Sequence, residues 1–423
     1  MRIAIVGGGV TGLVAARRLA AKHEVVLFEA QDRLGGHAHT HDVEVGGRRL
    51  RVDTGFMVFN RATYPGFVAL LDELGVGAVA SDMALSVRCR RCGLEYALRS
   101  VASVLAQPSN LLRPSFHRMF RDLFRFFREA RAWLAASAPD APSPAPDVTV
   151  RTFLQRGGYG DGFVRHWLLP TAGAVWSAPF GGVLDGSARM LLGFFDNHGF
   201  LRRRQLPWLT VAGGSRAYVE AVARDLGPRA RTSSAVRAIR RDGGGVTVEV
   251  AGRPLERFDH VVLACHADEA LALLPDADDA ERALLARFPY ARHRVVLHTD
   301  ASFLPRRRRA WSAWNCDVAD CRDDAAPASL TYHLNRLQNL PGEVPVCVTL
   351  NPSREPAGVL RELAYAHPTL TADAVAAQDA VAARNGARRT WFAGAHLRHG
   401  FHEDGLVAAT RVVAAIDALG ARS

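Results

Sequence analysis

The first thirty residues constrain the fold most, because a strand, a glycine-rich turn and a helix follow one another directly. Residues 2–6 are apolar and rich in β-branched side chains, which suits a buried parallel strand. Three glycines occupy positions 7–9, and a helical pattern of apolar residues begins at Val10. A second apolar strand, over 25–28, ends at Glu29. This order predicts an α/β protein that begins with a βαβ unit of the dinucleotide-binding type.

The glycines of this turn have separate physical roles at a dinucleotide site. Gly7 allows a sharp turn out of the strand, Gly9 lets a pyrophosphate approach the backbone, and Gly12 lets the helix pack closely on the sheet. The N–H groups of the first helical turn then face the phosphates. We expect Glu29 to accept hydrogen bonds from ribose hydroxyls, which disfavours a cofactor that carries a 2′-phosphate.

The segment after Glu29 indicates which dinucleotide binds. Residues 30–37 read Ala-Gln-Asp-Arg-Leu-Gly-Gly-His. This run resembles the second signature of the FAD-dependent amine oxidase superfamily, which includes monoamine and polyamine oxidases, phytoene desaturases and protoporphyrinogen oxidases. The resemblance implies FAD as the cofactor, with Arg33 and Gly36 at its site. His37 stands where the superfamily commonly has an arginine that contacts the pyrophosphate, so that contact stays open.

Two segments further along the chain carry the same resemblance. In the superfamily, an Asp-x-Gly segment passes along the flavin ring, which implies that Thr54, Gly55 and Phe56 lie beside it; packing within a strand pair is the alternative. The order of strand, hairpin and Asp-x-Val-Val-x-Ala over 234–264 implies that the backbone of Val236 contacts the adenine.

The end of the chain resembles the superfamily's last cofactor segment. An apolar strand over 390–393 is followed by Gly394, a glycine loop and a helix that we expect to begin at Leu406. The resemblance implies that the helix N-terminus faces the pyrimidine edge of the flavin. His396 replaces the usual acid, and Asp404 is the expected N-cap.

The predicted FAD-binding residues therefore come from segments far apart in the chain. They are Gly7, Gly9, Val10, Thr11, Gly12, Glu29, Arg33, Gly36, His37, Thr54, Gly55, Phe56, Val236, Gly394, Asp404, Gly405 and Leu406. Such a distribution predicts a discontinuous Rossmann-like FAD-binding domain formed by residues 1–85, 205–265 and 386–423. An inserted α+β substrate-binding domain would comprise residues 86–204 and 266–385.

The resemblance implies a reaction in which a hydride passes from a substrate carbon to the flavin N5. No catalytic residue is identified; the candidates are the titratable His402 and Glu403, and Trp176 as a wall of the substrate cavity, for which core packing is an equal alternative. Amine oxidases often keep a lysine that holds a water against N5. The only lysine, Lys22, lies at the end of the first helix, which disfavours ordinary amine oxidation.

Several segments resemble bacterial predicted NAD/FAD-binding proteins that often accompany cyclopropane-fatty-acid synthase-like methyltransferases. The segments are Arg-Leu-Gly-Gly-His, Asp-Thr-Gly-Phe-Met-Val-Phe-Asn, Thr-Tyr-x-Leu-Asn-Arg-Leu-Gln and Gly-Phe-His-Glu-Asp-Gly-Leu. The resemblance implies a lipid or fatty acyl substrate. An amine oxidase, an isoprenoid or carotenoid desaturase, and a flavin-binding protein without redox turnover are the alternatives.

The net charge of +11 is carried almost entirely by arginine and favours anionic partners. Residues 111–134 form a basic amphipathic helix pattern with an apolar stripe that includes Phe116, Met119 and Leu123. The stripe packs in the substrate domain or docks on an anionic membrane. No nucleic-acid-binding module accompanies the charge. With no apolar stretch long enough to span a membrane and no room for a leader before the first strand, we expect a cytoplasmic protein. If the stripe docks on a membrane, we expect the protein to be peripheral at the inner membrane face.

Cys89 and Cys92 form a single C-x-x-C pair, and no second pair at zinc spacing lies nearby in the sequence. We therefore expect no metal, and thiols that are structural or incidental, with a metal-binding or redox function as the alternative.

Overall fold

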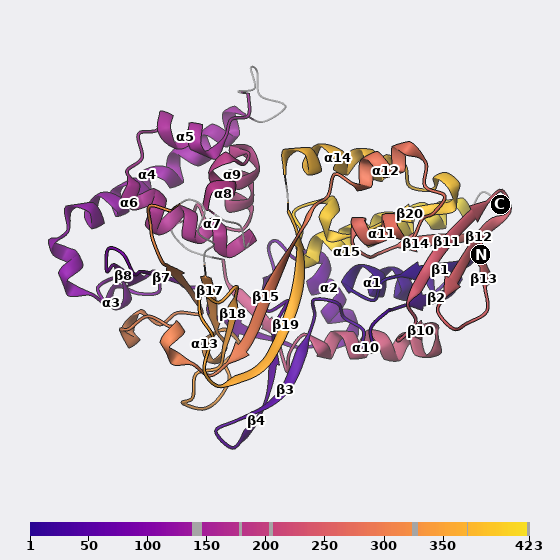
Figure 1. Ribbon diagram of the computed structural model, residues 1–423, viewed down its shortest axis with the longest axis horizontal. Helices are drawn as coiled ribbons and strands as arrows, with labels where there is room; N and C mark the ends of the chain where they lie inside the picture. The colour runs from indigo at the N-terminus through magenta and orange to yellow at the C-terminus, as the bar shows by residue number, and fades with distance from the viewer. Residues whose placement is uncertain (138–145, 177–179, 203–205, 324–328, 370, 421–423) are drawn as a thin grey trace.

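The computed structural model describes residues 1–423 except 138–145, 177–179, 203–205, 324–328, 370 and 421–423, and it also leaves the side chain of Trp176 undescribed. A helical region, a long mixed sheet and a parallel sheet follow one another across the molecule (Figure 1). The chain passes between these regions more than once, so that segments far apart in sequence share a sheet.

A five-stranded parallel sheet forms the nucleotide-binding side, in the order β10-β2-β1-β14-β20. Its strands alternate their side chains between two cores. On β1, Ile3 and Ile5 point into one core, and Ala4 and Val6 point into the other. The strands are β1 (Arg2–Val6), β2 (Glu24–Phe28), β10 (Ala230–Arg231), β14 (His260–Leu263) and β20 (Thr390–Phe392).

Helices cover both faces of the parallel sheet, which is why its strands read as continuous apolar runs. One face packs against α1 (Val10–Leu19), α2 (Pro65–Leu74), α10 (Arg216–Leu226) and α15 (His402–Gly420). The other face packs against α11 (Ala267–Ala272), α12 (Asp279–Leu285), α14 (Ala372–Ala383) and a three-stranded sheet of β11 (Val236–Asp242), β12 (Gly245–Val250) and β13 (Glu256–Phe258).

A seven-stranded sheet lies beside this unit, in the order β19-β15-β18-β17-β16-β7-β8. Its strands are β7 (Leu85–Cys89), β8 (Glu95–Ala97), β15 (Tyr290–His298), β16 (Trp314–Val318), β17 (Ser329–His333), β18 (Cys347–Leu350) and β19 (Val359–Pro368). A short helix, α13 (Leu334–Leu337), follows β17. A hairpin at Gly46 and Gly47 joins β3 (Thr40–Val45) to β4 (Arg48–Asp53), which pack on this sheet. A third small sheet contains β5 (Phe59–Asn60), β6 (Ala78–Ser81) and β9 (Trp208–Val211).

The remaining helices form the region at the left of Figure 1 and pack on β7 and β16. The predicted amphipathic helix is α4, and its apolar stripe packs in this helical core rather than lying free. The helices are α3 (Val101–Val104), a short 3₁₀ helix (Pro108–Leu112), α4 (Pro114–Ala136), α5 (Val150–Arg156), α6 (Asp161–Phe163), a π-helical turn (Val164–Leu168), α7 (Leu169–Trp176), α8 (Phe180–Asp185) and α9 (Ala188–Asn197).

Candidate cofactor site and substrate cavity

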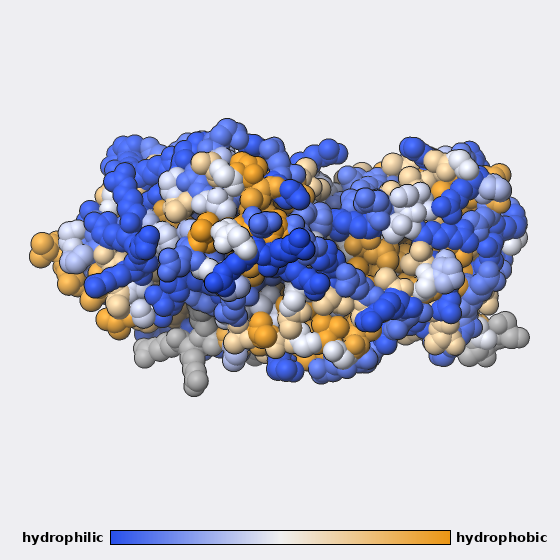
Figure 2. Space-filling model, turned by 90° about the horizontal axis from the view of Figure 1, so that it is seen from below, coloured by the Kyte–Doolittle hydropathy of each residue, from blue (hydrophilic) through white to orange (hydrophobic). Residues whose placement is uncertain are grey.

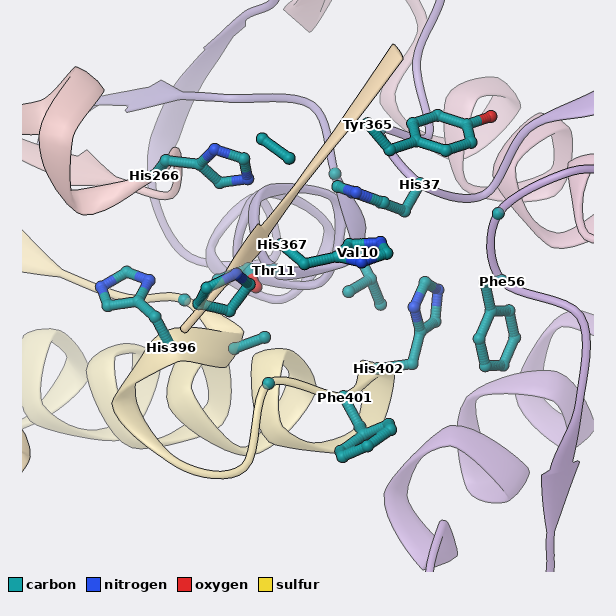
Figure 3. Close-up of a pocket in the computed structure, with 18 of the residues that line it drawn as sticks. Val10, Thr11, His37, Phe56, His266, Tyr365, His367, His396, Phe401 and His402 are labelled. Carbon is teal, nitrogen blue, oxygen red and sulfur yellow. The ribbon is translucent and has the colours of Figure 1, made fainter. Parts of the chain in front are cut away.

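A cavity of about 1060 Å³ is lined by residues from both the parallel sheet and the seven-stranded sheet. This volume lies at the upper end of the range for small-molecule sites, so it has room for a dinucleotide and a second molecule. Figure 3 shows how α1, the segment before α15, and β19 present side chains to the same hollow.

The first glycine turn shapes one end of the cavity. Gly7 has φ of +106°, and a Cβ added to it would lie 2.8 Å from the carbonyl oxygen of Ala264. A Cβ on Gly12 would lie 1.8 Å from the carbonyl oxygen of Gly7, so only glycine lets α1 approach the strand this closely. Gly9 differs because a Cβ there would meet no atom within 4 Å, and the residue lines the cavity together with Val10 and Thr11. The space over Gly9 suits a pyrophosphate at the helix N-terminus.

Glu29 lines the cavity at the end of β2. One carboxylate oxygen accepts the N–H of Gly8 at 2.7 Å, and the other accepts the N–H of Gln31 at 2.8 Å. Each oxygen has a further lone pair, so the carboxylate can still accept hydrogen bonds from ribose hydroxyls. Val236, at the start of β11, lines the same end.

The second glycine pair packs directly on the first turn. The N–H of Gly35 donates to the carbonyl oxygen of Gly8 at 2.8 Å, and a Cβ on Gly36 would lie 3.1 Å from the Cα of Gly9. The guanidinium of Arg33 donates to the carbonyl oxygen of Gly36 at 3.0 Å and lines the cavity. The two signatures in the first forty residues therefore form one continuous backbone cradle.

His37, which takes the place of an arginine, is a neutral acceptor rather than a cation. Burial is the main cause that lowers its pKa to about 4, and its ring donates to the backbone of Ala366. Its Nε2 is buried and has no hydrogen-bond partner within the described residues. An unpaired acceptor in a cavity wall fits a ligand hydroxyl or N–H group and gives no charge to neutralise a phosphate.

The Asp-Thr-Gly-Phe segment lies only partly at the cavity. Gly55 and Phe56 line it. The hydroxyl of Thr54 instead lies 2.7 Å from the hydroxyl of Tyr365, outside the lining. Thr54 therefore contacts Tyr365, which does line the cavity, and does not line the cavity itself.

The last segment differs from the prediction in where its helix begins. α15 starts at His402, four residues before Leu406, because the carboxylate of Asp404 reaches back to accept the N–H of Phe401 at 2.9 Å. The prediction of Asp404 as N-cap was wrong: it lies inside the first turn. A Cβ on Gly405 would lie 2.6 Å from Oγ1 of Thr11, so this glycine serves the packing of α15 on α1. Asp404, Gly405 and Leu406 do not line the cavity; Leu406 is buried in the core.

Gly394 and His396 do line the cavity, as does His402. Burial lowers the pKa of His396 to about 3, so the imidazole is neutral and does not supply the negative charge of the acid that it replaces.

His402 is the candidate catalytic residue that lies at the cavity. Its ring stacks on Phe56 at 3.7 Å between centroids, and its Nε2 lies 2.7 Å from the hydroxyl of Tyr218. Burial lowers its pKa to about 3, so it is neutral. Figure 3 shows the rings of His402 and Phe56 side by side, with His37 above them in this view.

The other two candidates do not share this position. The carboxylate of Glu403 accepts the N–H groups of Gly66 and Phe67, both at 2.8 Å, and so caps the first turn of α2 outside the cavity lining. The side chain of Trp176 lies outside the described residues. Lys22 is exposed and pairs with Asp417 at 2.6 Å, as expected for a lysine away from the cofactor.

Several residues on the cavity wall were not predicted from the sequence. His266, Tyr365 and His367 lie around His37, with ring centroids at 6.2, 5.1 and 5.4 Å from it. Tyr365 and His367 alternate along β19, and that period-two pattern was the one available signal.

Many of the other lining residues are apolar or aromatic. We group them under the name apolar end; they are Met57, Val58, Tyr64, Met83, Ala174, Val175, Phe194, Phe200, Trp208, Trp314, Tyr332, Leu337 and Phe401. Among the described lining residues the carboxylates are Glu29, Asp268 and Glu269, which all follow strands of the parallel sheet. His198, which packs on Phe194 at 3.9 Å, is neutral because burial lowers its pKa to about 4.

Cys89 and Cys92 are less isolated than the sequence suggested. His166 and Cys321 lie beside them, brought in from distant segments, so spacing along the chain did not reveal them.

Three features define the class of the protein. They are a parallel sheet with a glycine turn after its first strand, an acid after the second strand, and a C-terminal helix, α15, that packs on the same sheet. Together they are typical of an FAD-type dinucleotide-binding protein. A family model described as flavin containing amine oxidoreductase matches residues 10–308. The chain belongs to this family of FAD-dependent oxidoreductases, and its cofactor is FAD.

Similar proteins act on different substrates. A protein named as a flavin-containing monoamine oxidase, AofH, from Mycobacterium tuberculosis is 26% identical over 265 residues, which cover 58% of this chain and 53% of that protein. The chain spans about half the length, or less, of the curated relatives that it matches. The solved structure of putrescine oxidase bound to putrescine has a TM-score of 0.70 at 15% identity over 99% of both chains. A fatty acid isomerase from P. acnes has a TM-score of 0.65 at 18% identity over 98% of both chains. At these identities the structures show a shared fold.

In the part of the chain that the structure describes, no helix combines the length and apolar character needed to cross a membrane.

Proposed function

We propose that this chain is an FAD-dependent oxidoreductase that acts on an apolar, lipid-like substrate. Bound FAD supplies a hydride acceptor at its N5 atom. The glycine cradle and Glu29 would hold the dinucleotide, and the apolar end would hold the substrate beside it. A fatty acyl or phospholipid chain, oxidised or desaturated, is the substrate class we favour.

The observation that carries this proposal is the charge content of the apolar end. The carboxylates of the described lining are Glu29, Asp268 and Glu269, which all follow strands of the parallel sheet, and His198 is neutral. A buried ammonium group without a carboxylate partner is costly, whereas an alkyl chain gains about 25 cal/mol for each Å² that it buries. The cavity wall therefore favours an uncharged chain over a protonated amine.

Two features of the wall have roles that follow from their contacts. The stacked pair of Phe56 and His402 gives a flat, uncharged surface, and Tyr218 fixes the imidazole orientation through its hydroxyl. His37 offers an acceptor to a hydroxyl or N–H group of the cofactor. A neutral imidazole at His402 can form a hydrogen bond with a water at the edge of this surface.

The predicted division into domains is part of the proposal. Strands of the parallel sheet come from within 1–85, 205–265 and 386–423, and those of the seven-stranded sheet come from 85–97 and 290–368. This origin supports an FAD-binding domain of the first three segments, with 86–204 and 266–385 as the substrate-binding domain, although α11, α12 and α14, which lie within 266–385, pack on the parallel sheet.

An anaerobic flavin-bleaching screen tests the function. We expect lipid extracts and fatty acids to reduce the bound flavin and simple amines to leave it oxidised. Val175→Asp, which places a charge at the apolar end, should abolish reduction by lipid while FAD stays bound. Val375→Asp, on the exposed face of α14, is the matched control and should reduce normally. Reduction by amines alone would overturn the lipid proposal, and a flavin that no lipid, amine or polyene reduces would favour a non-redox role.

We also propose that the protein docks on anionic membranes, through exposed apolar side chains next to α4. Leu112 is 86% exposed and Val101 is 77% exposed, and Leu111 and Phe124 are about half exposed. Arg118 and Arg121 border Leu111 and Leu112 in a shallow surface hollow. Figure 2 shows hydrophobic residues at the left end of the molecule, where α3 and α4 lie in Figure 1. Exposed leucines beside arginines suit the interface of an anionic bilayer.

Cosedimentation with liposomes tests the membrane proposal. Leu111→Ser with Leu112→Ser should weaken binding to phosphatidylglycerol vesicles tenfold or more, since each buried leucine contributes about 1.5–3 kcal/mol. Val359→Ser changes an apolar residue on β19 that is 48% exposed, and this variant should bind as the native protein does. Equal binding by all three proteins, or none by the native protein, would refute docking at this surface.

A further inference from the structure

Four metal-ligating side chains converge between the helical region and the seven-stranded sheet. The ligand atoms of Cys89, Cys92, His166 and Cys321 all lie within 4.8 Å of one another. We propose that these four side chains bind one zinc ion in a structural site. None of the four lines the cavity described above, so the site is separate from the cofactor.

The spacing of the ligand atoms fits a tetrahedral metal centre. Zinc bonds of about 2.3 Å to sulfur and about 2.0–2.1 Å to nitrogen place neighbouring ligand atoms about 3.6–3.8 Å apart. Sγ of Cys92 already lies 3.3 Å from Nε2 of His166. The other separations need to contract by about 1 Å at most to reach that geometry. Three thiolates and one imidazole form a donor set that selects zinc.

The chain around the first two ligands is shaped for a metal. Cys89 ends β7, and Cys92 follows in a tight turn that Gly93 completes with φ of +66°. The N–H of Gly93 donates to the carbonyl oxygen of Cys89 at 3.0 Å. Backbone N–H groups also donate to both sulfurs, that of Cys92 to Cys89 and that of Leu94 to Cys92. Such N–H groups stabilise the thiolate form that coordinates a metal.

The third and fourth ligands come from elements that the fold holds in place. His166 lies in the π-helical turn Val164–Leu168, and turns of this kind are frequent at functional sites. The hydroxyl of Tyr96 donates to the carbonyl oxygen of His166 at 2.7 Å and fixes this turn against β8. Cys321 follows β16, in a segment tied to the first turn by an ion pair between Arg91 and Asp320.

The position of the site indicates what the metal does. With four protein ligands it has no open coordination position, which is typical of structural rather than catalytic zinc. The π-helical turn runs directly into α7, whose Ala174 and Val175 line the substrate cavity. The metal would therefore join the β7–β8 turn, the segment after β16 and the helix that forms part of the cavity wall.

Metal analysis of the full-length FAD-loaded protein, purified with reductant and passed over a chelating resin, tests the site. We expect about one zinc ion per chain. A mercurial that modifies thiols should release this zinc from the folded native protein, as read with a metal-sensitive dye, so the result does not depend on any variant folding. Cys92→Ser should lose most of the zinc and melt at a lower temperature. Cys347→Ala, a buried thiol in β18 away from the cluster, should keep it.

Several results would overturn the assignment. They are a folded native protein that binds no zinc even when zinc is supplied, iron in place of zinc, zinc that persists in Cys92→Ser, and a disulfide between Cys89 and Cys92 in protein kept reduced.

Discussion

Glu29 makes the sharpest test of the cofactor site, because both its carboxylate oxygens already accept backbone N–H groups, from Gly8 and Gln31. Replacing it by glutamine keeps the shape but leaves one N–H facing an amide NH₂ group. It also removes the charge that strengthens any hydrogen bond from a ribose hydroxyl. The loss of one charge-assisted hydrogen bond costs about 1.5–3 kcal/mol, which corresponds to about 10- to 150-fold weaker FAD binding.

Reconstitution of the deflavinated protein measures this effect through the quenching of flavin fluorescence. Since FMN lacks the adenosine ribose, Glu29→Gln should weaken FAD much more than FMN if the carboxylate binds that ribose. Glu24→Gln, at the exposed start of the same strand, serves as the control and should change neither affinity. Equal losses for FAD and FMN would show that Glu29 only holds the turn, and an unchanged FAD affinity would refute the placement of the ribose.

Two further predictions concern stability. Gly12→Ala places a Cβ 1.8 Å from a backbone oxygen and should cost about 3 kcal/mol or more, seen as lost soluble holoprotein, whereas Gly243→Ala meets no atom within 4 Å and should be neutral. Burial lowers the folded-state pKa of His396 and His402 to about 3, so between pH 6.5 and 4 only the unfolded chain gains these protons. The free energy of unfolding should therefore decrease as the pH is lowered through this range. We expect a decrease of up to about 1.4 kcal/mol per histidine per pH unit in a denaturant titration. Asp53, whose pKa burial raises to about 6, opposes this trend, but the lowered pKa values of other buried histidines, among them His37, His198 and His367, add to it, so a flat profile would contradict the prediction.

The backbone half of the site could be predicted from the sequence, and the side-chain half could not. The strand, turn and helix over 2–19 follow from local patterns, and Gly7 and Gly12 keep their expected positions because close approach leaves no alternative residue. β19 contributes Tyr365 and His367 from a strand that pairs with β15, so their place at the cavity depends on long-range pairing. Pattern alone does not give such pairing.

The errors at the C-terminal segment have a local cause. The run His402-Glu403-Asp404 offers more than one capping carboxylate, and sequence did not reveal which backbone groups each would meet. Asp404 turns back to the N–H of Phe401, while Glu403 reaches across to α2, 337 residues away from Gly66 along the chain. The zinc ligands show the same limit, since Cys92 and His166 are 74 residues apart.

Fold alone does not choose the substrate, since a putrescine oxidase and a fatty acid isomerase share this architecture. The histidines of the wall carry the missing information. Burial holds His37, His198 and His402 uncharged down to a pH of about 3 to 4, which means that the wall at these three positions does not stabilise a positive charge. A substrate ammonium beside them would meet the same loss of hydration, because the carboxylates of the described lining, Glu29, Asp268 and Glu269, all follow strands of the parallel sheet. A neutral chain avoids that cost, and for this reason the electrostatics of the wall, rather than the fold, favour a lipid over an amine.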